Sequence, residues 1–337
     1  MRSSLFLIIP FLFFFHPMTA NTEPEVDQIS TLLEVYSDER KELITEAIYS
    51  CLDKLDPFIR DKFCLYGLGS LASNTITPQS DVEFGIFTEI ELEKEAFFPF
   101  LDALDEALRK KGIFLDTNGS IPKFIKNGKH QGSLIFCTTA HCLIEKLKYN
   151  RILFPYLFYS TTYIFGEKRL YEEFIQERGS LHLAKQRAYY SEMHETFKKN
   201  FLIRQLLHGI TVYRENEKWD IGWNYKYNLI RPLVDLLNYF SFLVDFNNHN
   251  PFEQIQHLEK QEILTPDLAK QLRLILANSY KHRILEGDKI FYFAHLNQEE
   301  TGYLHFQWKT ILEFEDLLKK QLSVKLDSLK KSHTLLI

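Results

Sequence analysis

Two acidic residues, Asp81 and Glu83, lie two positions apart in the segment SDVEF. Residues i and i+2 of a β-strand point to the same face, so a strand that begins at Asp81 would place the two carboxylates side by side. Two carboxylates so close repel each other unless cations lie between them, and hard oxygen ligands suit Mg²⁺. The spacing therefore predicts a metal site of the kind used in phosphoryl chemistry.

A third acid, Asp116, follows in the strand-like run IFLDTNG. Two-metal transfer requires a further carboxylate from another direction, which binds the second ion or takes the proton of the attacking hydroxyl. Asp116 is the natural candidate for this role. We therefore expect Asp81, Glu83 and Asp116 to serve both as metal ligands and as catalytic residues.

The segment GLGSLA, just before these acids, admits two interpretations. It could be the phosphate turn of a dinucleotide-dependent oxidoreductase, with Glu89 as the ribose-binding acid. That fold needs a long helix after the turn, whereas Pro78 leaves room for about two helical turns. In the second interpretation, Gly69 lets a phosphate approach the backbone, and Ser70 begins a short helix whose free N–H groups hold the terminal phosphates of a nucleotide.

The order of these features resembles the polymerase-beta-type nucleotidyltransferase superfamily. Within it the chain is most similar to the nucleotidyltransferases related to the N-terminal domain of protein-PII uridylyltransferase, over roughly residues 35 to 300. The family pattern is a Gly-Ser turn, a Pro-x-Ser-Asp-x-acid strand and a later Asp before a Gly-rich turn. The resemblance implies that Gly69, Ser70 and Ser80 bind nucleotide and that the three acids bind metal.

A later segment, YKYNLIRPLVDLL, resembles the basic helix that opens the helical domain of that family. The resemblance implies that Lys226 and Arg231 contact the triphosphate. The chain also departs from the family pattern, because many relatives carry Arg and Gly at the positions of Ser73 and Asn74. One phosphate-facing cation is therefore missing at Ser73, but no metal ligand is lost.

The activity that the resemblance implies is transfer of a nucleoside monophosphate from UTP or ATP to an acceptor hydroxyl. Two Mg²⁺ ions would assist, and pyrophosphate would be released. The choice of base and the acceptor stay open, with a protein hydroxyl among the possible acceptors. A non-catalytic nucleotide-binding or regulatory module of the same fold is the alternative. The formal charge of -5 disfavours nucleic acid as a partner.

The elements around these motifs predict two folded regions. Strands and helices alternate up to about Phe165, including an amphipathic helix from Ser37 to Leu55. Long helical periodicities then take over. We expect an α/β (α+β) nucleotidyltransferase catalytic domain with a small mixed sheet, followed by an α-helical domain; the predicted segments are a leader at 1–20, a helical segment at 21–62, the catalytic domain at 63–170 and the helical domain at 171–337.

The leader has the layout of a secretory signal, with Arg2 before an apolar run from Leu5 to Phe15 and a small residue at Ala20. The run is too short to span a bilayer comfortably, and we expect no spanning helix beyond it. A cleaved signal would export the protein. A short membrane anchor and an apolar extension are the alternatives, and a cytoplasmic location stays open.

Overall fold

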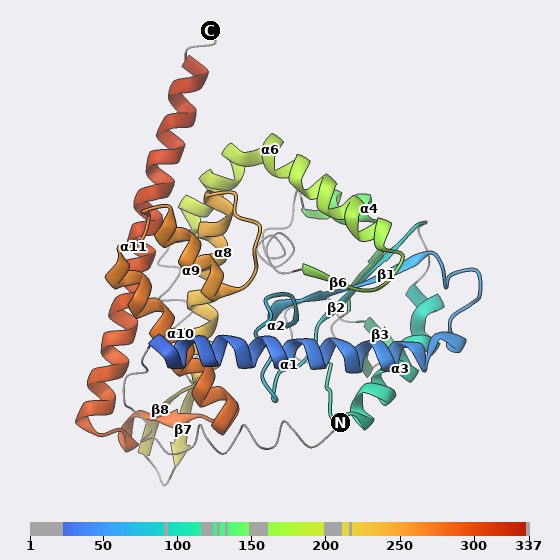
Figure 1. The fold of residues 1–337 in the computed structure, drawn as a ribbon, viewed down its shortest axis with the longest axis horizontal. Helices are drawn as coiled ribbons and strands as arrows, with labels where there is room; N and C mark the ends of the chain where they lie inside the picture. Colours follow the sequence, from blue (N-terminus) through green and yellow to red (C-terminus); the bar gives the residue numbers. More distant parts are fainter. Residues whose placement is uncertain are drawn as a thin grey trace.

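The computed structural model describes residues 23–90, 94–115, 124–126, 129–131, 134–147, 161–198, 211–215 and 218–334. It shows an α+β fold in which helices predominate (Figure 1). The predicted leader at 1–20 and the third acid, Asp116, lie outside the described residues. None of the helices in the described ranges combines the length and the apolar character needed to cross a membrane.

A four-stranded mixed sheet forms the centre of the N-terminal region, in the order β5-β2-β1-β6. Its strands are β1 (Phe63–Leu68), β2 (Phe84–Thr88), β5 (Leu134–Thr138) and β6 (Thr161–Gly166). β1 pairs antiparallel with β2 and β6, whereas β2 pairs parallel with β5. The hairpin of β3 (Phe124–Lys126) and β4 (Lys129–Gln131) is separate. The predicted small mixed sheet is therefore confirmed.

Both faces of this sheet are buried. Side chains alternate along β1, so successive residues lie in two different cores. Phe63 and Leu65 lie in one core, shared with α3 (Phe98–Lys110). Cys64 and Tyr66 lie in a second core, shared with α4 (Ala140–Leu147) and α6 (Lys168–Lys198). Tyr66 stands opposite Gly85, where an added Cβ would come within 1.9 Å of the Tyr66 ring. Glycine at position 85 is thus required for the aromatic packing.

The first helix, α1 (Glu23–Tyr49), crosses from one core to the other. Val26 and Leu33 lie in the core with α6, and Ile44 and Ile48 lie in the core with α3. Figure 1 shows the helix running from α10 (Pro266–Glu286) to α3. The two regions therefore share one helix.

The predicted start of this helix at Ser37 is wrong. Ser37 lies inside α1 and is fully buried, and its hydroxyl donates to the carbonyl of Leu33 at 2.7 Å. Serine favours helix starts, but its hydroxyl can also bond the carbonyl one turn earlier, which explains the error. The helix also ends earlier than predicted, at Tyr49, and a separate 3₁₀ turn (Leu52–Lys54) follows.

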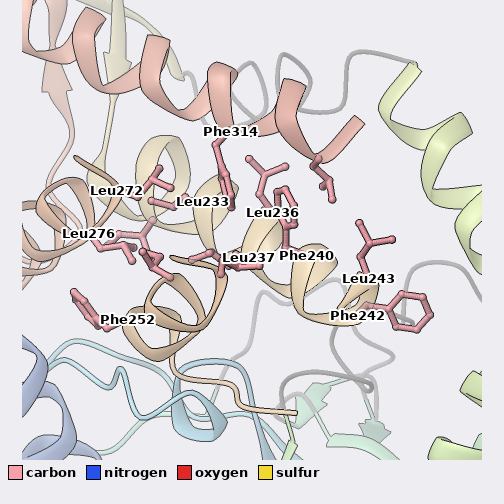
Figure 2. Packing of buried hydrophobic residues seen from close by; sticks show 14 of the residues in the cluster. Leu233, Leu236, Leu237, Phe240, Phe242, Leu243, Phe252, Leu272, Leu276 and Phe314 are labelled. Carbon is pink, nitrogen blue, oxygen red and sulfur yellow. The ribbon is translucent and has the colours of Figure 1, made fainter. Parts of the chain in front are cut away.

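Among the described residues, four helices dominate the C-terminal region: α8 (Arg231–Leu243), α9 (Pro251–Lys260), α10 and α11 (Gln298–Thr334). Figure 2 shows their apolar core, in which Leu236 and Phe240 of α8 face Phe314 of α11. The rings of Phe240 and Phe314 are stacked, with centroids 4.8 Å apart. Thr265 caps α10 by accepting the backbone N–H of Leu268. Packing and caps together fix these helices.

The C-terminal region also contains a sheet that the helical periodicity does not predict. β7 (Thr211–Glu215), β8 (Lys218–Trp223) and β9 (Phe291–Tyr292) form a three-stranded antiparallel sheet. The segment TVYRE of β7 is rich in β-branched and aromatic residues, which fit a pleated surface. β9 has only two residues, and its pairing depends on α10 bringing it back to β8. The region predicted as an α-helical domain is therefore mainly helical in its described residues but also contains this small sheet.

Candidate active site

The Gly-Ser turn and the acidic segment meet where β1 ends. The backbone N–H of Leu68 donates to the carbonyl of Glu83 at 3.1 Å. A single helical turn, α2 (Gly69–Ala72), follows β1 directly and contains Ser70. Gly69 has a φ of +55°, and a Cβ built on it would lie 3.0 Å from Oε2 of Glu83. The carboxylate of Glu83 therefore lies over Gly69, in the space that a side chain would need.

Asp81 and Glu83 lie on one side of the segment that leads into β2. Both acids are half-buried, whereas Val82 between them and Phe84 after them lie in the core with α3. Val82 is fixed by an isolated parallel bridge to Leu115. β2 itself begins at Phe84, three residues after the predicted start. The alternation of burial nevertheless begins at Asp81 and supports a common face for the two acids.

Ser80, which precedes the first acid, is 3% exposed and makes contacts within the protein. Its hydroxyl oxygen accepts the backbone N–H of Thr77 at 2.9 Å and Nη1 of Arg283 at 3.3 Å. These contacts close the turn before Asp81 and tie it to α10. The predicted contact of Ser80 with nucleotide stays a prediction.

Lys226 reaches the first acid from the C-terminal region. Its ammonium lies 3.5 Å from Oδ1 of Asp81 and 3.8 Å from Oδ2 of Asp288. The residue begins a π-helical turn, Lys226–Ile230, directly before α8. Asn224 steadies this turn by accepting the backbone N–H of Tyr227 at 2.8 Å. Such π-helical turns are frequent at functional sites.

Arg231, the second predicted phosphate contact, begins α8 and lies one helical turn before Asp235. Burial raises the pKa of Asp235 to about 6, and the positive charge of Arg231 opposes that rise. The charge of Arg231 thus acts on an acid of its own helix. Its contact with a triphosphate stays a prediction.

Arg283 and Asp288 form a charged cluster with Lys226 and Asp81. The sequence did not lead us to predict a role for Arg283 or Asp288. Nε of Arg283 donates to Oδ1 of Asp288 at 2.7 Å, and Nη2 lies 3.5 Å from Oδ2. The side chain of Arg283 is only 4% exposed, whereas that of Asp288 is 34% exposed. The signal available in the sequence was an Arg in the last turn of a helix followed by a Gly-Asp pair. Gly287 has a φ of +70°, which lets the chain turn back and brings Asp288 to Arg283.

The loop between the turn and the acids is held from α1. The amide of Ile76 donates to Oγ of Ser37 at 3.1 Å, and Nζ of Lys41 donates to Oδ1 of Asn74 at 2.6 Å. Asn74 has a φ of +55°, a left-handed conformation that Asn tolerates better than most residues. Asparagine therefore adopts here a conformation that glycine would adopt easily, and it adds a bond to α1.

The other departure, Ser73, also serves the loop. Its hydroxyl lies 2.7 Å from that of Thr75 and donates to the carbonyl of Gly69 at 3.1 Å. Ser73 is buried, with 6% of its surface exposed. The side chain thus stabilises the Gly-Ser turn from within.

The residues that would hold a metal are described only in part. Asp116 lies outside the described residues; Leu115, which precedes Asp116 in the chain, is bridged to Val82. Within the described ranges, no three His, Cys, Asp or Glu side chains form a group that could hold a metal ion.

The two described acids nevertheless fit a divalent ion. Asp81 and Glu83 offer hard carboxylate oxygens, which Mg²⁺ prefers. Asp81 already has a cation beside it, the ammonium of Lys226. These carboxylates therefore suit a metal site whose third expected ligand is Asp116.

No protein-family model matches this chain, and no curated protein matches it. A function must therefore be argued from the residues and contacts given above.

Proposed function

We propose that the protein is a magnesium-dependent nucleotidyltransferase with the corresponding catalytic fold. The observation that carries the proposal is the position of the Glu83 carboxylate over Gly69. It joins the expected phosphate turn and the expected metal-binding segment in one site. The ion pair of Lys226 with Asp81 adds positive charge to the same place from a distant part of the chain.

Each residue of the site has a proposed role. Asp81, Glu83 and Asp116 would hold two Mg²⁺ ions, which would neutralise charge on the transferring phosphate and activate the acceptor hydroxyl. Asp116 also takes the proton of that hydroxyl. Gly69 and Ser70 offer backbone N–H groups to the β- and γ-phosphates, and the missing side chain of Gly69 allows their close approach.

The proposed reaction is an in-line displacement. The acceptor oxygen forms a bond to the α-phosphorus, the bond between the α- and β-phosphates breaks, and pyrophosphate leaves. Lys226 and Arg231 are proposed to attract the triphosphate, because charge-assisted bonds to phosphate are strong. UTP and ATP are the candidate nucleotides, and a protein hydroxyl is a candidate acceptor.

Pyrophosphate release from labelled UTP or ATP, in the presence of Mg²⁺ and a cell lysate as the source of acceptor, tests the proposal. Asp81→Asn should lower the rate by at least about a hundredfold, since a metal ligand is lost. Asp53→Asn is the matched control, because Asp53 is an exposed acid paired with Lys54. Release that survives Asp81→Asn unchanged would sink the proposal, whereas a labelled species that depends on Asp81 would identify the acceptor.

A nucleotide-binding module without turnover is the second candidate. It is favoured by Ser73 and Asn74, whose side chains bond within the loop and to α1 where relatives carry a phosphate-facing Arg and a Gly. Calorimetry separates the two functions. Tight binding of a Mg–nucleotide complex, with no pyrophosphate released in any lysate, would support the second.

A further inference from the structure

The ammonium of Lys226 lies between two carboxylates at nearly equal distances. Oδ1 of Asp81 is 3.5 Å away, and Oδ2 of Asp288 is 3.8 Å away. The side chain of Lys226 is 24% exposed, so water screens these interactions only in part. Lysine is a compact charge on a flexible stem, and a small movement would shift it from one carboxylate to the other.

The second carboxylate is fixed, because Arg283 holds Asp288. Nε of Arg283 donates to Oδ1 of Asp288 at 2.7 Å, while Nη1 donates to Oγ of Ser80 at 3.3 Å. Ser80 precedes Asp81 in the chain. A single buried guanidinium therefore binds Asp288 directly and also binds the residue that precedes Asp81.

The described residues of this cluster carry charges of both signs. The carboxylates of Asp81, Glu83 and Asp288 supply three negative charges, and Lys226 and Arg283 supply two positive ones. A divalent ion arriving alone must compete with the ammonium for Asp81. An ion that arrives with a triphosphate brings negative charge that the ammonium can attract while it pairs with Asp288 instead of Asp81.

We propose that Lys226 is a built-in counter-ion of the site, which exchanges from Asp81 to Asp288 when a metal–nucleoside triphosphate complex binds. The proposal rests on the proposed function for the identity of the ligand. Asp288 is then a positioning residue, because it receives the ammonium that leaves Asp81. The site favours the metal–nucleotide complex over the bare metal, and the two ligands bind with positive coupling.

Titration of the full chain with Mn²⁺, followed by the electron paramagnetic resonance signal of the free ion, tests this exchange. Lys226→Met removes the competing charge and keeps an apolar stem, so Mn²⁺ should bind about three- to tenfold more tightly. Asp288→Asn leaves the ammonium on Asp81, so Mn²⁺ should bind more weakly. The double variant should bind as tightly as Lys226→Met alone.

The double variant distinguishes exchange from simple charge effects. If Asp288 acts only through its own negative charge, Asp288→Asn will weaken binding equally with and without Lys226, and the inference fails. Lys289→Met is the control for net charge, because Lys289 is 59% exposed and paired with Glu286. It should change Mn²⁺ affinity less than Lys226→Met does. Melting temperatures near that of the wild type show that the variants are folded.

The failure of this inference and the failure of the proposed function look different. If Asp81→Asn abolishes Mn²⁺ binding but Lys226→Met does not tighten it, the metal site stands and the exchange is overturned. If Asp81→Asn binds Mn²⁺ as the wild type does, the metal site of the proposed function is itself misplaced. Adding a non-hydrolysable UTP or ATP analogue should tighten Mn²⁺ binding to the wild type more than to Lys226→Met, and equal tightening contradicts the exchange.

Discussion

Oε2 of Glu83 lies 3.0 Å from the point that a Cβ on Gly69 would occupy. The Gly-Ser turn and the acidic segment are thus in contact, and Gly69 also has a backbone conformation that disfavours any side chain. Two separate costs would follow from adding a methyl group at this position. The first is strain in the left-handed backbone of residue 69, and the second is displacement of the Glu83 carboxylate.

Gly69→Ala should therefore lower both stability and activity. The left-handed backbone costs about 1–2 kcal/mol of unfolding free energy, and displacement of Glu83 should lower pyrophosphate release by about a hundredfold. Gly112→Ala is the matched control, because Gly112 also has a positive φ but a Cβ added to it would meet nothing within 4 Å. Urea unfolding should show similar losses for both variants. Equal activity of the two variants would contradict the proposed role of Glu83.

The buried ion pair of Arg283 predicts a large effect on stability. Arg283→Leu should cost about 2–3 kcal/mol of unfolding free energy, since it removes charge-assisted bonds to Asp288 and Ser80. Arg109→Leu offers a comparison, because Arg109 also binds an acid through Nε near the end of a helix but is 47% exposed. It should cost at most about 1 kcal/mol. Similar urea midpoints for the two variants would show that burial of Arg283 adds nothing.

The left-handed backbone of Asn74 predicts that a glycine variant will be more stable than an alanine variant. Asn74→Ala should lose about 1–2 kcal/mol, because alanine tolerates the φ of +55° poorly and cannot accept the bond from Lys41. Asn74→Gly should lie within about 0.5 kcal/mol of the wild type, since relief of the backbone offsets the lost bond. Thermal unfolding measures both. A glycine variant less stable than the alanine variant would show that the bond to Lys41 outweighs the backbone conformation.

The raised pKa of Asp235 predicts a pH dependence of a definite sign. Burial raises this pKa from 3.8 to about 6, so the folded state binds the proton more tightly than the unfolded state does. The stabilising contribution is fully present below the unfolded pKa and is lost as the pH rises through the folded pKa, up to about 3 kcal/mol. Asp235→Asn should thus become increasingly more stable than the wild type between about pH 4 and pH 7.

Urea unfolding of both proteins at several pH values measures this difference. Asp53→Asn tests the sign, because a hydrogen bond from the side chain of Lys54 lowers the pKa of Asp53. Its stability relative to the wild type should therefore change with pH in the opposite direction. A difference for Asp235→Asn that does not vary with pH would rule out a raised pKa.

Local patterns predicted the turn and the strand around the site. KFCLYGL is a short run of strand formers, and it forms β1; GSLA begins a helix that ends well before Pro78. The common face of Asp81 and Glu83 depends only on the two-residue period of extended chain. Such features follow from neighbouring residues and need no knowledge of the rest of the fold.

Contacts between distant segments could not be predicted in this way. Arg283 and Ser80 are 203 positions apart, and Lys226 and Asp81 are 145 positions apart. The resemblance suggested a role for Lys226, whereas the Arg and Gly-Asp signal at Arg283 and Asp288 did not reveal their contacts with Ser80 and Lys226. The start of α1 was misplaced for a related reason, because only the packed structure shows which backbone group the hydroxyl of Ser37 satisfies.

Because α1 lies in both cores, it connects the regions on the two sides of the predicted boundary near residue 170. A chain divided there would leave the C-terminal piece without Val26 and Leu33, which complete its core. The N-terminal piece would keep α1 but expose the apolar side of its first half. We therefore expect the two regions to unfold together. A destabilising substitution in the helical region should also disturb the positions of Asp81 and Glu83.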